Sequence, residues 1–309
     1  MLLCLALIWG THWPVSKIGL RDLPPFTYGT LRVVTGVATL AVLLAFRRGL
    51  RLPSRQDLPV VFSVGLGQMA TGIILMNLAL SMISAGRASV LYYTMPLWVA
   101  LIKFRDLRTG GAKRQVAGLV LGLGGIGVLL NPAAINWSSN GVVLGSVALL
   151  FSAFCWALVT IHLRAHKWHA TTLELEPWQL LVALVPIAAA ALALEWGRAI
   201  HWEPTTIAAI LYSGPLATAV AYWLSQSISR SLSPFAATMG FLAVPVVGLA
   251  SSAIMLGEPI TVLDFLGAAA TFLGIVVISV SPRSAGAEPS TDPVVGSGMI
   301  EAGPRVVRG

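Results

Sequence analysis

Ten apolar segments of about twenty residues constrain this chain more than any other feature. About 20 apolar residues are needed to cross the hydrocarbon core of a bilayer. Charged residues make up 10% of the chain and hydrophobic residues 56%, whereas a soluble domain carries about 25% charged residues. The chain is therefore predicted to be an all-α integral membrane protein. The expected spans are 1–20, 26–46, 58–80, 86–103, 114–131, 141–162, 175–195, 205–228, 234–256 and 262–281.

The two halves of the chain repeat one another at a constant offset of 149 residues. Five spans in each half is an odd number, so the second half must enter the membrane from the opposite side. We predict ten transmembrane helices arranged as two inverted five-helix repeats, 1–131 and 141–281, around a central cavity, with 282–309 as a disordered cytoplasmic tail. The matching pairs are Gly65 and Gly214, Pro96 and Pro245, Gly118 and Gly267, and Gly125 and Gly274.

Each half contains one span interrupted by a proline. Pro96 breaks the apolar run from Ser84 to Trp98, and Pro245 lies at the matching place in the second half. Proline lacks an N–H and clashes with the carbonyl four residues earlier. Inside a bilayer such a gap is tolerated where protein or a water-lined cavity covers it. Paired interrupted helices point to a transporter binding site, so we predict that both prolines act as hinges.

The basic residues predict the orientation of the chain. Fifteen of the twenty lysines and arginines fall on one side of the predicted spans and four on the other, which places both termini in the cytoplasm. These residues form no basic face interleaved with aromatic side chains, so we do not expect nucleic-acid binding. Arg32 lies inside a span; it is expected to snorkel or pair structurally, with substrate contact as the alternative.

Aromatic and polar residues recur at helical spacing on several spans, which predicts faces that look inward. Aromatic walls suit an amphipathic solute with an apolar or aromatic body, and a cationic ammonium would also gain from cation–π contacts. For the mid-span aromatic residues helix packing is the alternative, and for His12 a neutral packing role. The candidate substrate-binding residues are Trp9, His12, Trp13, Gln68, Ser89, Tyr92, Tyr93, Trp156, Thr160, Tyr222, Met239 and Phe241.

Signals for an enzyme, a cofactor or a metal site are lacking. Gly122, Gly124 and Gly127 spell a dinucleotide-binding motif, but inside an apolar span rather than between a strand and a helix. Gly118, Gly122 and Gly125 instead fall on one helical face at i, i+4 and i+7, where small residues let helices approach closely. There is no P-loop, no His-Glu-x-x-His and no serine in a nucleophile-elbow context. All twelve carboxylates are placed in connections, near span ends or in the tail. We therefore expect no mid-membrane proton relay.

A series of short motifs adds a family resemblance. In order they are Trp9-Gly10, Pro25-Phe26, Leu31-Arg32, Ala79-Leu80, Ser84-Ala85-Gly86-Arg87-Ala88-Ser89, Pro96, Gly118, Gly125, Pro245, Gly257-Glu258-Pro259, Gly267 and Gly274. Over residues 1–281 the chain resembles the drug/metabolite transporter superfamily, in its ten-helix EamA-type branch. The tryptophans of the first span and the segment from Ala88 to Tyr93 are most similar to the YddG-type aromatic amino acid exporters. The Gly-Glu-Pro motif has no first-half copy, because Thr109-Gly110 stands there.

The resemblance implies a bacterial inner-membrane transporter that exports amino acids, aromatic or other apolar ones, by alternating access. Because no mid-membrane carboxylate is expected, we predict weak or no ion coupling, or coupling through His12. The alternative is a multidrug, quaternary-ammonium or nucleoside exporter of the same fold. The expected partners are a small-molecule substrate and the lipid bilayer, and the sequence leaves the oligomeric state open.

Overall fold

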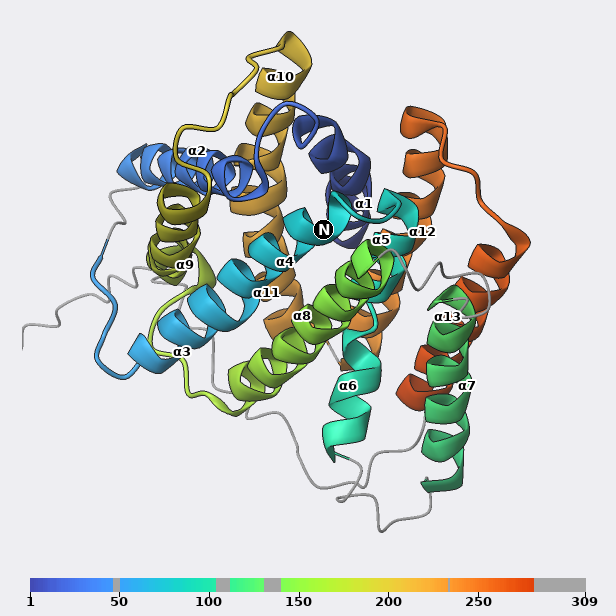
Figure 1. The fold of residues 1–309 in the computed structure, drawn as a ribbon. Coiled ribbons are helices and arrows are strands. Elements are labelled where there is room, and N and C mark those ends of the chain that lie inside the picture. The colour runs from blue at the N-terminus through green and yellow to red at the C-terminus, as the bar shows by residue number, and fades with distance from the viewer. Residues whose placement is uncertain (47–50, 104–111, 131–139, 233, 281–309) are drawn as a thin grey trace, which may run out of the picture.

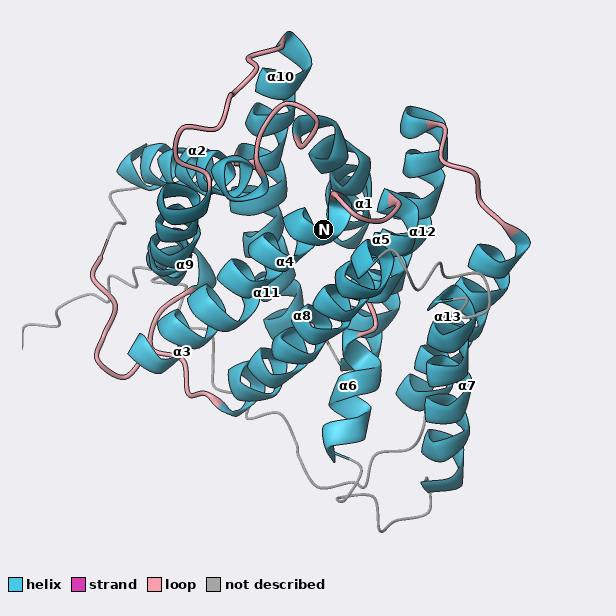
Figure 2. Cartoon of the chain, in the orientation of Figure 1, coloured by secondary structure: helices cyan, strands magenta, loops and turns pink. Residues whose placement is uncertain are grey.

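The described chain is built of helices joined by loops and turns. The computed structural model describes residues 1–46, 51–103, 112–130, 140–232 and 234–280, and these contain no strand (Figure 2). The side chains of 112, 140, 234–236, 238 and 239 lie outside this description, as does the tail predicted at 282–309. The predicted all-α class is confirmed.

The helices follow the order of the predicted spans. Their bounds are α1 Leu2–Gly19, α2 Pro25–Phe46, α3 Leu58–Phe62, η1 Ser63–Ala70, α4 Thr71–Leu80, α5 Ala85–Tyr92, α6 Met95–Ile102, α7 Ala112–Leu130, α8 Asn140–Ala165, α9 Thr172–Leu194, α10 Pro204–Ser213, η3 Pro215–Val220, α11 Ala221–Ser231, α12 Pro234–Leu256 and α13 Val262–Val280. Seven helical stretches among the described residues are long and apolar enough to cross a membrane: α2, α3 to α4, α7, α8, α9, α10 to α11, and α13. Gly240–Leu256 of α12 is a shorter apolar helix. A multi-span membrane protein is therefore confirmed.

Several helix ends are set by local chemistry. Pro25 and Pro204 begin α2 and α10, where a missing N–H costs nothing. Thr171 and Glu174 form a capping box at the start of α9, which satisfies two backbone donors. Gly257 follows α12 with a φ of 66°, a left-handed conformation that favours glycine at a helix C-terminus.

Most of the helix packing joins the two halves of the chain. At one edge of the molecule α7 lies beside α13, and at the opposite edge α2 packs against α9 (Figure 1). In the middle, α1 packs against α12 and α10, while α8 packs against α5, α6 and α4. Exchanging the halves relates α1 to α8, α12 to α5 and α6, and the span from α10 to α11 to the span from α3 to α4. The contacts of α1 therefore correspond to those of α8. A two-fold relation between inverted repeats requires this pattern, although the repeat boundaries stay a prediction.

One of the two predicted helix breaks is present. α5 ends at Tyr92 and α6 begins at Met95, which puts Pro96 in the first turn of the new helix. α12 runs through Pro245 without interruption, so the expectation of a matching break there was wrong. The missing N–H of Pro96 costs no hydrogen bond there, because the N–H groups in the first turn of a helix have no intrahelical acceptor.

The irregularity that does recur in both halves is a stretch of π-helix. η1 lies between α3 and α4, and η3 occupies the matching place between α10 and α11. In both, a threonine hydroxyl donates to the carbonyl five residues earlier: Thr71 to Leu66 and Thr218 to Ser213, each at 2.8 Å. The Leu66 carbonyl also accepts the backbone N–H of Thr71, so the hydroxyl adds a second bond to a carbonyl of the wider turn. π-Helical turns are frequent at functional sites.

Candidate functional site

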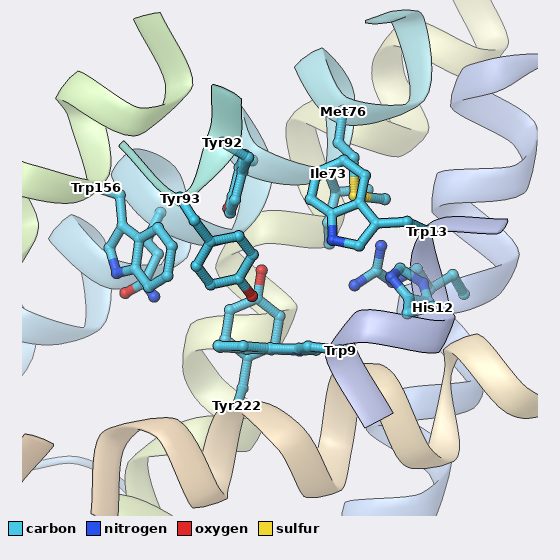
Figure 3. Close-up of a pocket in the computed structure, with 12 residues that line it drawn as sticks. Trp9, His12, Trp13, Ile73, Met76, Tyr92, Tyr93, Trp156 and Tyr222 are labelled. Carbon is cyan, nitrogen blue, oxygen red and sulfur yellow. The ribbon is translucent and has the colours of Figure 1, made fainter. Parts of the chain in front are cut away.

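A chamber lies between the halves, walled by aromatic side chains from several helices (Figure 3). α1, α2, η1, α4 and α5 contribute from the first half, and α8 and α11 from the second. Eight of the twelve predicted substrate-binding residues line it. The full lining is Trp9, His12, Trp13, Arg32, Gln68, Gly72, Ile73, Met76, Tyr92, Tyr93, Trp156 and Tyr222.

Trp9 stands at the centre of the aromatic wall. Its ring centroid lies 5.4 Å from that of Tyr222 and 6.1 Å from that of Trp156, both in edge-on geometry. Its indole N–H donates to the carbonyl of Ala217 in η3 at 2.9 Å. Figure 3 shows Trp9, Tyr222, Tyr93 and Trp156 gathered on one side of the chamber. The hydrogen bond therefore fixes the central ring of α1 to the π-helical segment of the other half.

Tyr92 links the two sides of this wall. Its ring lies 5.5 Å from Trp13 and 5.3 Å from Trp156, and Trp156 lies 5.6 Å from Tyr93. Aromatic pairs at such distances contribute about 0.5–1.5 kcal/mol each beyond their buried area. The wall is thus a set of mutually supporting rings contributed by both halves.

The chamber is closed in this conformation. The space it leaves for the centres of water-sized molecules is about 20 Å³, which is room for about one water. An amino-acid-sized solute would need the aromatic rings to separate. The aromatic rings therefore fill most of the volume between the halves.

Besides the tyrosine hydroxyls, three polar side chains line the chamber. His12 is buried and its Nε2 forms a 2.8 Å hydrogen bond with Ser16. Arg32 is 3% exposed and donates from Nε to the Thr218 hydroxyl at 2.6 Å. Gln68, from η1, is also 3% exposed. The chamber therefore combines apolar walls with one fixed positive charge, one imidazole and one amide.

Three of the predicted residues, Ser89, Thr160 and Phe241, lie elsewhere. Ser89 is buried, donates to the carbonyl of Gly86 and packs beside Gly248 of α12. Thr160 donates to the carbonyl of Trp156 along its own helix. Phe241 stands behind the wall, with its ring 6.4 Å from Trp9 and 6.2 Å from Trp156. The side chain of Met239 lies outside the described residues.

The predicted substrate-binding set omitted four lining residues: Arg32, Gly72, Ile73 and Met76. A charged residue inside a span is by default a functional candidate, and this signal could have added Arg32 to the predicted set. Gly72 faces the chamber because the Tyr92 hydroxyl occupies the place of its missing side chain: a Cβ there would lie 2.7 Å from that oxygen. Which residue faces Tyr92 depends on tertiary packing, which spacing along one helix does not reveal.

One of the carboxylates that the sequence places near a span end is buried. Glu176, counted as a span-end residue, is fully buried in the second turn of α9, because α11 covers this part of the helix. Glu176 is thus a buried carboxylate near the end of its span, and the prediction concerned carboxylates at mid-span. Glu176 is not among the residues that line the chamber.

At the end of the bundle where α1 finishes, Glu258 of the Gly-Glu-Pro motif joins the halves. It pairs with Lys17 at 2.9 Å and accepts the backbone N–H groups of Ala85 and Gly86 at 2.9 and 3.1 Å. Next to it, Arg87 pairs with Asp264 at 3.0 Å. The motif thus caps α5 from the other half of the chain.

At the opposite end, Asp57 precedes α3 and holds the loop after α8. Its Oδ1 lies 3.1 Å from His166 Nε2 and 3.6 Å from His169 Nδ1, and its Oδ2 accepts the Ser54 hydroxyl. Burial raises the pKa of Asp57, but hydrogen bonds from His166, Ser54 and the His169 backbone outweigh it and lower that pKa below 3.8. Among the described residues, the side chains of Asp57, His166 and His169 have ligand atoms that lie close enough together to hold a metal ion, although these atoms already contact one another.

Comparison with known proteins agrees with this architecture. An "Uncharacterized transporter YoaV" of Bacillus subtilis (strain 168) is 26% identical over 89% of this chain and 94% of its own length. A "Probable amino-acid metabolite efflux pump" of Escherichia coli (strain K12) is 28% identical over 89% of this chain and 92% of its own. One solved crystal structure, 18% identical, has the same fold, with a TM-score of 0.61 over 89% of this chain and 94% of that one.

The family assignment rests on matches in both halves. The model of the EamA-like transporter family matches residues 1–131 and 143–280. The resemblance at the level of the family is confirmed, whereas the YddG-type branch stays a prediction. With most of its length covered, the chain belongs to the EamA-like transporter family, within the drug/metabolite transporter superfamily.

Proposed function

We propose that this protein exports amino acids, aromatic or other apolar ones, across the bacterial inner membrane, with both termini in the cytoplasm. The observation that carries the proposal is the chamber between the halves, whose rings come from α1 and α5 on one side and α8 and α11 on the other. The efflux-pump name of the Escherichia coli relative supports the substrate class. Apolar walls with a few placed polar groups are typical of small-molecule sites.

The proposed cycle is alternating access, in which the two halves rock about the chamber. Separation of the Trp9 and Tyr93 rings from the Trp156 ring would make room for a solute. Pro96 follows the turn that divides α5 from α6, and that turn is a place where the helix can bend. We assign the same role to Pro245, although α12 runs through it without interruption in this structure.

Ion coupling is proposed to be weak or absent, or to pass through His12. Among the described residues no carboxylate lines the chamber, and His12 is bonded to Ser16. The buried Glu176 lies outside the lining, so a proton there would not meet the substrate directly. Counterflow with and without a proton gradient tests this. Strict gradient dependence that persists in both His12→Ala and Glu176→Gln would contradict the proposal.

The function itself is tested by counterflow of radiolabelled amino acids in proteoliposomes. Wild-type protein is expected to exchange aromatic and other apolar amino acids. Tyr92→Ala and Trp156→Ala remove rings from the wall and are expected to reduce exchange at least tenfold, since each loses ring contacts worth about 0.5–1.5 kcal/mol apiece. Ile254→Ala is the control, because its side chain is 84% exposed, facing away from the chamber. Normal exchange in both wall variants would remove the site assignment.

The rival proposal is export of quaternary ammonium compounds. The clustered rings favour it, because aromatic cages bind such cations by cation–π contacts. The guanidinium of Arg32 opposes it, because a fixed positive charge in the same chamber repels a cation. Exchange of tetraphenylphosphonium without exchange of any amino acid would establish the rival.

A further inference from the structure

Arg32 carries a positive charge that the protein itself does not balance. The residue is in the second turn of α2 and is 3% exposed. The ion pairs among the described residues join Lys17 to Glu258, Arg87 to Asp264, and His166 and His169 to Asp57, and none includes Arg32. An unbalanced charge in such surroundings is costly and is retained where it serves a function.

The Arg32 guanidinium is hydrogen-bonded through Nε and leaves Nη1 without a partner in the part of the chain that the structure describes. Its Nε donates to the Thr218 hydroxyl at 2.6 Å, and that hydroxyl donates in turn to the carbonyl of Ser213 at 2.8 Å. Its Nη1 is buried and has no hydrogen-bond partner among the described residues. Since arginine stays protonated in proteins, this edge is a donor without an acceptor. The π-helical segment η3 thus holds the guanidinium of Arg32 through Nε and leaves its Nη1 available.

Gln68 presents a second unsatisfied group to the same chamber. It belongs to η1, the π-helical segment of the first half, and its Oε1 is buried without a partner among the described residues. An amide oxygen accepts hydrogen bonds from an ammonium group. The aromatic chamber is therefore lined by two buried polar groups with different ligand preferences. Arg32 can bind an anion, and Gln68 can accept a hydrogen bond from a donor.

We infer that this chamber recognises solutes with a carboxylate, which binds the free edge of Arg32. An ammonium group on the same solute is received by Gln68, and its apolar body lies among the rings of Trp9, Tyr92 and Trp156. The inference rests on the proposed function and deepens it, since it names the charged group that every substrate must carry. The planar fork of arginine matches a carboxylate in two-point geometry. The same charge excludes solutes that are purely cationic.

The test uses full-length wild-type protein in detergent and competition against radiolabelled phenylalanine. The competitors are unlabelled phenylalanine, phenylalanine amide, phenethylamine and 3-phenylpropanoate, which share the ring and differ in their charged groups. Phenylalanine amide and phenethylamine are expected to bind at least about tenfold more weakly than phenylalanine, because they leave Arg32 unpaired. 3-Phenylpropanoate keeps the carboxylate and is expected to bind better than phenethylamine.

Variants locate the effect at Arg32. Arg32→Gln is expected to weaken phenylalanine at least about tenfold while leaving phenylalanine amide nearly unchanged, so that the preference disappears. Arg32→Lys keeps the charge and is expected to keep part of the preference. Arg198→Gln removes an exposed arginine outside the chamber and is expected to leave both affinities unchanged.

Each outcome has a defined meaning. Equal binding of phenylalanine and its amide by wild-type protein, or an unchanged ratio in a well-folded Arg32→Gln variant, would overturn the inference. If Arg32→Gln does not fold, the competitor series on wild-type protein decides alone. Failure to bind or exchange any amino acid, with tetraphenylphosphonium still exchanged, would defeat the proposed function and this inference with it. Amino-acid exchange without carboxylate preference would defeat the inference only.

Discussion

The hydroxyl of Tyr92 ends against the backbone of Gly72, and this contact positions one ring of the chamber. A Cβ on residue 72 would lie 2.7 Å from that hydroxyl, while the next ring atom stands 3.8 Å away. The clash is thus confined to the hydroxyl at the end of the side chain. The position of the ring depends on a glycine in a different helix.

We expect Gly72→Ala to lower the melting temperature and to raise the KM for exchange, because the Tyr92 ring must shift. Overpacking of this kind costs about 1–3 kcal/mol. In the Tyr92→Phe background, which lacks the hydroxyl, the same substitution should cost much less. A double-mutant cycle of thermal unfolding in detergent measures the coupling. An equal cost in both backgrounds would show that the hydroxyl does not set the ring position.

Helical spacing in the sequence predicted some residues of the chamber correctly and others wrongly. Helical spacing identified Trp9, Tyr92 and Trp156 as inward-facing, since polar and aromatic stripes avoid lipid. The same reasoning included Ser89 and Thr160, which hydrogen-bond within their own helices. Periodicity identifies a face of a helix, but not which part of that face meets a cavity and which part meets another helix.

Among the helices, α7 and α13 show how closely two backbones can approach. A Cβ on Gly125 would lie 2.5 Å from the backbone nitrogen of Thr271, and one on Gly274 would lie 2.5 Å from that of Gly122. Backbone atoms cannot move aside as a side-chain tip can. Small residues let membrane helices come this close, and the sequence had predicted this packing for Gly118, Gly122 and Gly125.

We expect Gly125→Ala to destabilise the protein by about 1–3 kcal/mol through this overpacking. Gly124→Ala is the matched control, because a Cβ there meets nothing within 4 Å. The two variants differ by one position in the same helix and share the same gain in helix propensity. Thermal unfolding of both in the same detergent makes the comparison. Equal melting temperatures would contradict the close approach of α7 and α13.

The π-helical segments were not predicted, for a clear reason. The sequence offset of 149 pairs Gly65 with Gly214, and these glycines lie in η1 and next to η3. The glycines alone do not distinguish close packing from a wider helical turn. Hydrogen bonds from Thr71 and Thr218 to carbonyls five residues earlier stabilise the wider turn, and their geometry exists only in the folded helices.

Across the molecule, contacts between the halves close both ends of the bundle. Glu258 ties the loop after α12 to Lys17 and to the start of α5, while Asp57 ties the start of α3 to the loop after α8. These contacts therefore join the halves at both ends of the bundle, on either side of the small chamber. Transport by alternating access would require each set to open in turn.

We expect Glu258→Gln to favour opening at the α5 end. Charge-assisted hydrogen bonds contribute about 1.5–3 kcal/mol each, so losing them should raise the open population roughly tenfold or more. Labelling of Ala88→Cys by a membrane-impermeant maleimide, in a background without Cys4 and Cys155, measures the opening. Glu203→Gln, an exposed carboxylate without a side-chain cap bond, is the control. Labelling that is no faster in Glu258→Gln would mean that other contacts hold this end closed.

The opposite end should respond to acid. The folded pKa of Asp57 is below the usual 3.8, so its stabilising contribution is complete above that value and is lost as pH falls through the folded pKa. We expect Asp57→Asn to lower the melting temperature at about pH 5, and to lower it progressively less as pH falls below about 4. Thermal unfolding across this range measures the difference, with Glu203→Gln as the control. A difference that grows toward acid would reverse the assigned sign.

The alternation of apolar spans with short charged connections required a helical membrane protein, because unpaired backbone groups are not tolerated in lipid. The internal repeat and the basic residues likewise predicted inverted halves and an orientation. The local sequence pattern did not predict that α12 continues through Pro245 or that Glu176 is buried. It also did not predict that Arg32 lines the chamber with an Nη1 that has no partner within the described ranges. Those features depend on which helices meet side by side, and only packing between residues far apart in the chain sets that.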